Sequence, residues 1–167
     1  MSPLLDEALS AVESLEDADD DELYRQLGLR MSAMERDPKL AGHFAPPATA
    51  LEPMGMTLGD IIGAGRRAFA TLSSASYALL CSGGPMGGRF DAFVDTLGTN
   101  RMAITAALAT VLVAQIGIAP AIAGVVATLA IGKAAPASME VMCTIWAKKA
   151  GIEQSTAPAP AAQPAMS

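Results

Sequence analysis

Few side chains in this 167-residue sequence have the type and spacing that catalysis or metal binding requires. His43 is the one histidine, and it lies in a proline-rich stretch where no second histidine or carboxylate spacing suggests a triad or a ligand set. The two cysteines, Cys81 and Cys143, are too few for a disulfide scaffold or a structural zinc site. We therefore expect no catalytic residue and no metal ligand.

Two further patterns imitate functional motifs. Residues 63–68 read Gly-Ala-Gly-Arg-Arg-Ala, which has the spacing of a dinucleotide-binding turn. The preceding residues 57–62 favour helix over strand, and no acid follows about 20 residues later, so we interpret these glycines as sites of close helix packing. The acids at positions 19–22 lack the spacing of a calcium loop and fit a helix cap better. The sequence therefore predicts no cofactor site.

The two cysteines need a separate interpretation. Cys81 and Cys143 could approach each other in a helical bundle, but neither stands beside a basic residue that would mark a reactive thiolate. Free cysteine is among the most buried residue types. We therefore expect two buried free thiols.

Composition and charge limit the class of protein. Hydrophobic residues make up 51% of the chain and charged residues 17%, which argues against disorder. A net charge of -6 disfavours nucleic acid as a partner. Residues 1–60 hold 13 acids and 4 bases, whereas residues 61–167 hold 4 acids and 7 bases. This asymmetry predicts either a membrane-facing half and a solvated half, or two halves that attract each other.

Apolar residues recur at helical spacing through most of the chain, and no stretch alternates as a half-buried strand does. The pattern predicts helices over about 3–16, 20–37, 57–81 and 90–97, with an extended proline-rich connection over 38–56. Asp19 and Thr57 are suited to cap the second and third of these helices. Gly83 and Gly84 interrupt the pattern, and we expect a hinge there.

The most distinctive segment is residues 102–132, which carry no formal charge over 31 positions. A run of about 18 or more apolar residues is the usual signal of a membrane-spanning helix. Gly117 and Pro120 interrupt this run, so we expect a hairpin of two helices, each shorter than a hydrocarbon core of about 30 Å. Gly117, Pro120 and Gly124 are the predicted turn and packing positions, because small residues let helix backbones approach closely.

A last helix is expected between Pro136 and Gly151. One face of this helix carries Met139, Met142, Cys143 and Trp146, and its C-terminal end carries Lys148 and Lys149. Tryptophan beside lysines is typical of a helix at a membrane interface. The same residues also suit a core helix whose lysines stabilise its C-terminus, and both interpretations stay open.

Together these features predict an all-α protein, a bundle of about six or seven helices around an apolar Ala/Gly-rich C-terminal hairpin. Residues 1–56 form an acidic helical pair with the proline-rich connection, and residues 57–152 form the helical core with the hairpin at 102–132. The Ala/Pro-rich residues 153–167 are expected to be a disordered tail.

Two functions are compatible with these features. In the first, the protein is non-enzymatic and membrane-associated, and its hairpin inserts into or oligomerises within a bilayer as a pore-forming or permeabilising element. In the alternative, the hairpin is the buried core of a soluble adaptor or oligomeric interaction module. The mean hydropathy of +0.36 favours the first, and the break between short half-helices favours the second.

Both functions imply a partner and a set of contact residues. We expect membrane lipid or a protein partner and a homo-oligomer, at a membrane or in the cytoplasm, because the acidic start of the chain does not resemble a signal peptide. The predicted contact residues lie along the apolar run and the last helix: Ile104, Leu108, Leu112, Ile118, Ile122, Val126, Leu129, Trp146, Lys148 and Lys149.

Overall fold

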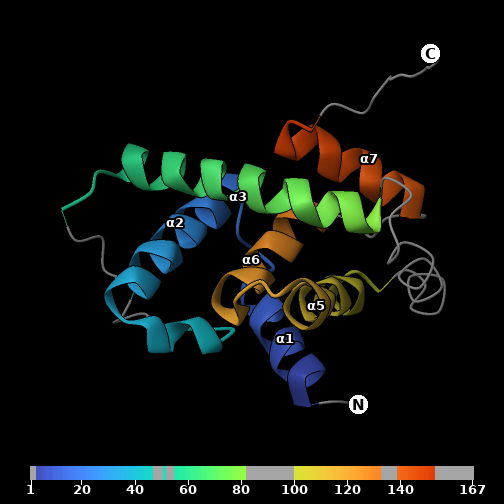
Figure 1. Ribbon diagram of the computed structural model, residues 1–167, viewed down its shortest axis with the longest axis horizontal. Coiled ribbons are helices and arrows are strands. Elements are labelled where there is room, and N and C mark those ends of the chain that lie inside the picture. Colours follow the sequence, from blue (N-terminus) through green and yellow to red (C-terminus); the bar gives the residue numbers. More distant parts are fainter. Residues whose placement is uncertain (1–2, 47–50, 52–54, 82–99, 133–138, 153–167) are drawn as a thin grey trace.

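The computed structural model describes residues 3–46, 51, 55–81, 100–132 and 139–152. These residues form six α-helices, one 3-10 turn and one π-helical turn, and they contain no strand, so the all-α prediction is confirmed for this part of the chain (Figure 1). The elements in chain order are α1 (Pro3–Ser14), α2 (Asp20–Arg36), η1 (Pro38–Gly42), α3 (Leu58–Leu80), α5 (Arg101–Val111), η3 (Leu112–Ile116), α6 (Pro120–Ile131) and α7 (Met139–Ala150).

Side-chain caps fix where several helices begin. The Asp19 carboxylate accepts a hydrogen bond from the backbone N–H of Glu22 at 2.8 Å, and the Thr57 hydroxyl accepts one from the N–H of Asp60 at 3.1 Å. Each bond satisfies a backbone donor that has no partner within its helix. Both predicted caps are confirmed, and Asn100 supplies a third at the start of α5.

The connection after α2 is more ordered than an extended chain. Residues 38–42 form η1, where Pro38 occupies the first turn and Asp37 accepts a hydrogen bond from the N–H of Lys39 at 3.2 Å. Proline has no N–H to leave unpaired and its φ suits the start of a helix, so a proline with a preceding cap favours a short turn. The prediction of an extended segment was wrong over these residues.

The helices α2 and α3 cross at two glycines. A Cβ atom on Gly28 would overlap with the backbone carbonyl of Ile61, and one on Gly65 would overlap with the backbone of Tyr24. Only glycine permits the two backbones to come this close. The interpretation of residues 63–68 as a packing segment is therefore confirmed at Gly65.

The helix α6 lies near the middle of the molecule (Figure 1) and is enclosed by other elements. All its residues after Pro120 are buried, and it contacts α1, α2, α5, α7 and η1. The predicted break between the two apolar segments is present, because Gly117 takes a left-handed φ of 88° at the end of η3 and Pro120 opens α6. Gly124 faces α1, where a Cβ atom would lie 4.0 Å from the Cβ of Ala11.

None of the helices in the described ranges combines the length and the apolar character that crossing a bilayer requires.

The helix α7 packs on α6 and on α3. Met142 and Trp146 are buried on the face that the sequence predicted to be apolar. The indole Nε1 of Trp146 donates a hydrogen bond to the hydroxyl of Ser73 at 3.0 Å, and its ring lies edge-on to that of Tyr77. This hydrogen bond satisfies the one polar group of a large buried side chain. The predicted helix 90–97, the hinge at Gly83 and Gly84, and the tail 153–167 lie outside the described residues.

We expect Gly65→Ala to lower the free energy of unfolding by about 1–3 kcal/mol, because the added methyl group must push the backbone of α2 away. Gly59→Ala, in the same helix but with no neighbouring atom within 4 Å of the new Cβ, is the matched control. It should raise stability by about 0.5–1 kcal/mol through better helix propensity. Urea denaturation measures both variants, and equal effects would contradict the close crossing.

Candidate functional site

A groove of about 400 Å³ opens where α2, α3 and α7 meet. Its lining combines cations, one acid, an aromatic ring and an aliphatic side chain: Asp20, Tyr24, Arg66, Ile145, Lys148 and Lys149. The groove therefore contains the two predicted contact lysines. Its mixture of charged and apolar surface is typical of a site that contacts another molecule.

Ion pairs connect the acidic start of α2 to the helices around it. Asp21 pairs with Arg66 of α3 at 3.0 Å, and Asp20 pairs with Lys149 of α7 at 3.3 Å. Glu16, in the turn before α2, pairs with Arg101 of α5 at 3.6 Å. The acidic and the basic parts of the chain thus attract each other, which was one of the two interpretations of the charge asymmetry. The pair of Asp21 and Arg66 is exposed on both sides, and a pair of this kind contributes about 0–1 kcal/mol.

The ring of Tyr24 lines the groove beside these ion pairs. The guanidinium of Arg66 lies 4.7 Å from the ring centroid, in position for a cation–π contact. Burial raises the pKa of the Tyr24 phenol, and the negative charge of Asp20 adds to this rise. The phenol therefore stays neutral at physiological pH and stacks without adding charge to the groove.

The outer face of α7 continues the groove as a stripe of exposed residues, which we call the α7 stripe: Val141, Ile145 and Lys148. Their spacing of four and three residues places them on one side of the helix. Val141 is 40% exposed and Ile145 is 37% exposed, which makes them two of the few large apolar side chains at the surface of the described residues. Lys148 has no ion-pair partner within the described ranges, in contrast to Lys149.

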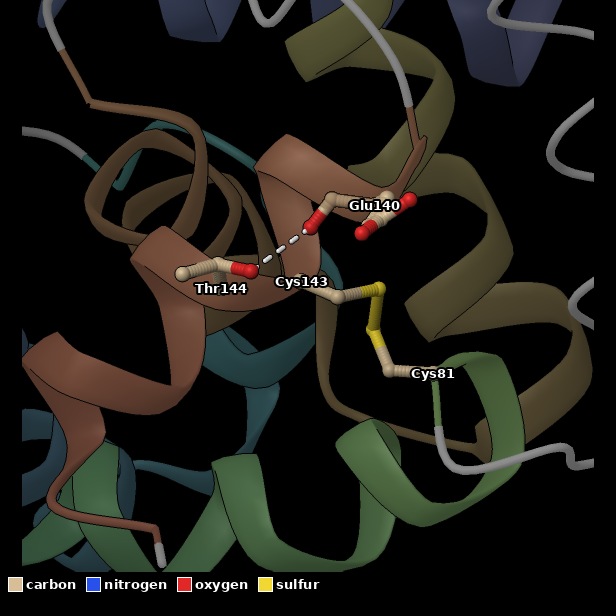
Figure 2. Close-up of a disulfide and its surroundings, with 4 residues drawn as sticks. All are labelled: Cys81, Glu140, Cys143 and Thr144. Atoms are coloured by element: carbon tan, nitrogen blue, oxygen red, sulfur yellow. Dashed lines mark hydrogen bonds between the residues drawn. A yellow bond between two sulfur atoms is a disulfide. The ribbon is translucent and has the colours of Figure 1, made fainter. Parts of the chain in front are cut away.

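A disulfide joins Cys81, the residue that ends α3, to Cys143 in the middle of α7 (Figure 2). The Cα atoms are 5.7 Å apart although the two residues are 62 positions apart in sequence. The prediction of two free thiols was wrong. Neighbouring residues in sequence give no sign of a bridge, because it depends on two distant helices meeting at the correct separation and angle.

A buried arginine holds the groove helix α2 to the centre of the molecule. Arg30 is only 5% exposed, and its Nη1 donates hydrogen bonds to the carbonyls of Phe44 and Ala121, both at 2.9 Å. Burial lowers its pKa to about 10, so the guanidinium remains charged at neutral pH. Sequence reasoning missed this residue. Its position one turn after Leu27 on the apolar stripe of α2 was the available signal, because a charge there requires buried partners.

The predicted contact residues fall into two groups. Eight are buried and contact protein in this arrangement: Ile104, Leu108, Leu112, Ile118, Ile122, Val126, Leu129 and Trp146. Only Lys148 and Lys149 reach the groove. The fold therefore separates residues that the sequence grouped together.

No cluster of three or more potential metal ligands occurs among the residues that the structure places. The prediction that the chain binds no metal stays a prediction for the whole protein.

We expect Arg30→Met to lower the free energy of unfolding by about 3 kcal/mol, because the carbonyls of Phe44 and Ala121 lose their charged donor inside the protein. Arg25→Met is the matched control on the same helix. Arg25 is partly exposed and pairs with Glu22 at 2.8 Å, so its loss should cost about 0.5 kcal/mol. Denaturant unfolding at neutral pH compares the two, and similar losses would refute the structural role of Arg30.

No family model, no curated protein and no solved structure matches this chain. Its function is therefore inferred from its residues and their arrangement.

Proposed function

We propose that the chain is a non-enzymatic helical interaction module whose apolar helices α5 and α6 form its core. The observation that carries this proposal is the enclosure of α6, which is apolar and buried around its whole circumference. A helix that is hydrophobic on all sides is buried either in protein or in a membrane. Contacts with α1, α2, α5 and α7 cover it with protein, which supports the interaction module over insertion in this conformation.

The contact surface in this proposal is the α7 stripe together with the groove beside it. Lys148 supplies a charge without an ion-pair partner among the described residues, and Ile145 supplies apolar area next to it. These features suit a protein segment that carries both carboxylates and apolar side chains, either on another protein or on a second copy of the chain. The buried Trp146 supports such a role, because it holds α7 in place while the opposite face remains exposed.

The first test separates the module from an integral membrane protein. Cells that express the full chain are fractionated, and the membranes are extracted with carbonate at high pH. We expect the chain to be released, because its apolar helices are already covered by protein. Light scattering after size exclusion then gives its oligomeric state. Retention in the carbonate-washed pellet would overturn the proposal.

The second test locates the surface that contacts a partner. The photo-crosslinking residue p-benzoylphenylalanine replaces Ile145 in one sample and Leu58 in another, and both are irradiated in cells. Leu58 is the matched control, because it is 60% exposed but lies at the start of α3, outside the groove. We expect a discrete crosslinked product at position 145 alone, and its loss when Lys148→Glu is added. Equal products at both positions, or none at position 145, would contradict the assigned surface.

The product mass identifies the class of partner. A crosslinked species of twice 17.0 kDa indicates a second copy of the chain, and any other discrete mass indicates a different protein.

Membrane insertion is the second candidate function, and one observation favours it: residues 102–132 carry no formal charge. In this candidate α5 and α6 leave the core and enter a bilayer. The chain should then release dye from anionic vesicles, and Gly83→Ala with Gly84→Ala should suppress the release by stiffening the predicted hinge. Lys148→Ala with Lys149→Ala should weaken vesicle binding. An intact vesicle population would remove this candidate.

A further inference from the structure

The two half-cystines of the disulfide differ in how far their residues are exposed. Cys143 is 9% exposed and lies within α7, whereas Cys81 is half-buried at the end of α3. The backbone N–H of Cys81 still bonds to the carbonyl of Tyr77 at 2.7 Å, so this residue is held at the helix terminus. Attack on a disulfide requires access to a sulfur atom, so the higher exposure of the residue Cys81 favours its sulfur as the point of attack.

The position of the bridge in the chain gives it a structural consequence. The loop that it closes, residues 81–143, contains the whole of α5 and α6. The bridge also joins α7 to α3. A second attachment between these two helices, the hydrogen bond from Trp146 to Ser73, lies one turn after Cys143 in α7. With the bridge intact, a covalent bond adds to the packing of α7 on α3 and α6. With the bridge open, only noncovalent contacts hold α7 over α6.

We propose that Cys81–Cys143 is a thiol–disulfide exchange site that controls whether α7 covers α6. A dithiol reductant of the thioredoxin class attacks through its thiolate on the sulfur of Cys81, and Cys143 leaves as a thiolate that takes a proton from water. The second thiol of the reductant then displaces Cys81. The bridge gains two electrons and two protons, and the reductant becomes a disulfide. Reducing compartments favour the open form and oxidising compartments the closed form.

One charged residue lies beside the reacting sulfurs. Figure 2 shows Glu140, one turn before Cys143 in α7, with its carboxylate on the side of the helix that carries the disulfide. A negative charge there opposes the approach of a thiolate and the departure of another. The charge of Glu140 should therefore slow exchange. Glu140→Gln should accelerate reduction by about two- to tenfold at low salt, and added salt should shrink the difference because it screens the charge.

The conformational part is tested on the purified full chain by hydrogen exchange with mass spectrometry. Reduction with dithiothreitol should accelerate amide exchange in α6 and α7 by about tenfold or more, while the α2–α3 crossing at Gly65 keeps its protection. Cys81→Ser with Cys143→Ser should show the fast exchange without reductant and should not respond to it. If reduction leaves exchange in α6 and α7 unchanged, the proposal is overturned.

The chemical part is tested by trapping the mixed disulfide. A thioredoxin whose resolving cysteine is replaced by serine is incubated with the oxidised wild-type chain, and the adduct is mapped by peptide mass spectrometry. The expected adduct is on Cys81. An adduct on Cys143, or none, contradicts the assigned order of attack. This test uses the wild-type chain, so it identifies the attacked cysteine even if the double serine variant does not fold.

This inference goes beyond the proposed interaction module. Both tests use the isolated chain, so their failure leaves the crosslinking result at Ile145 unaffected. In the same way, a missing partner would leave the redox response intact.

Discussion

The burial of α6 is the constraint on which the other features of this fold depend. Its eleven residues from Ala121 to Ile131 are all buried, and it has no polar face to leave in water. Such a helix must be covered on every side. The surrounding helices α1, α2, α5 and α7 supply that cover, and the exposed polar residues of α1, α2 and α7 face solvent. The one-sided apolar stripes of α1 and α2 follow from this arrangement.

Ion pairs, a buried arginine and a disulfide hold these helices around α6, and their contributions to the free energy of unfolding differ. The ion pairs of Asp20 and Asp21 are exposed and contribute about 0–1 kcal/mol each. Arg30 binds the first turn of α6 through the carbonyl of Ala121, inside the protein, where a charged hydrogen bond is worth about 1.5–3 kcal/mol. A disulfide that closes a loop of this size contributes about 4 kcal/mol by chain entropy. Of these three kinds of attachment, the disulfide makes the largest contribution to the free energy of unfolding.

These magnitudes also explain why one surface carries the proposed function. On the outer side of α7, Ile145 and Lys148 face solvent, whereas Trp146 on its inner side is fully buried. A helix that is held firmly on one side can present the other with a smaller loss of conformational entropy when it binds. The same attachment makes α7 the element whose release would uncover α6, so the proposed contact surface and the proposed exchange site lie on one helix.

Local interactions made part of this protein predictable from its sequence. Helix periodicity, the caps at Asp19 and Thr57, and the break at Gly117 each depend on residues within about four positions of one another, which a pattern records directly. The packing role of Gly65 was also accessible, because glycine inside a helix indicates close approach.

Only the tertiary structure decided the pairing of distant residues. The bridge from Cys81 to Cys143, the carbonyl partners of Arg30 and the cation–π contact of Arg66 all join positions far apart in the chain. The sequence states which side chains could bond, but their partners depend on how helices cross. Burial likewise depends partly on the sequence and partly on the tertiary structure. The uncharged run 102–132 predicts a largely apolar environment, and in the structure the packing of the surrounding helices buries its second part, α6, in protein.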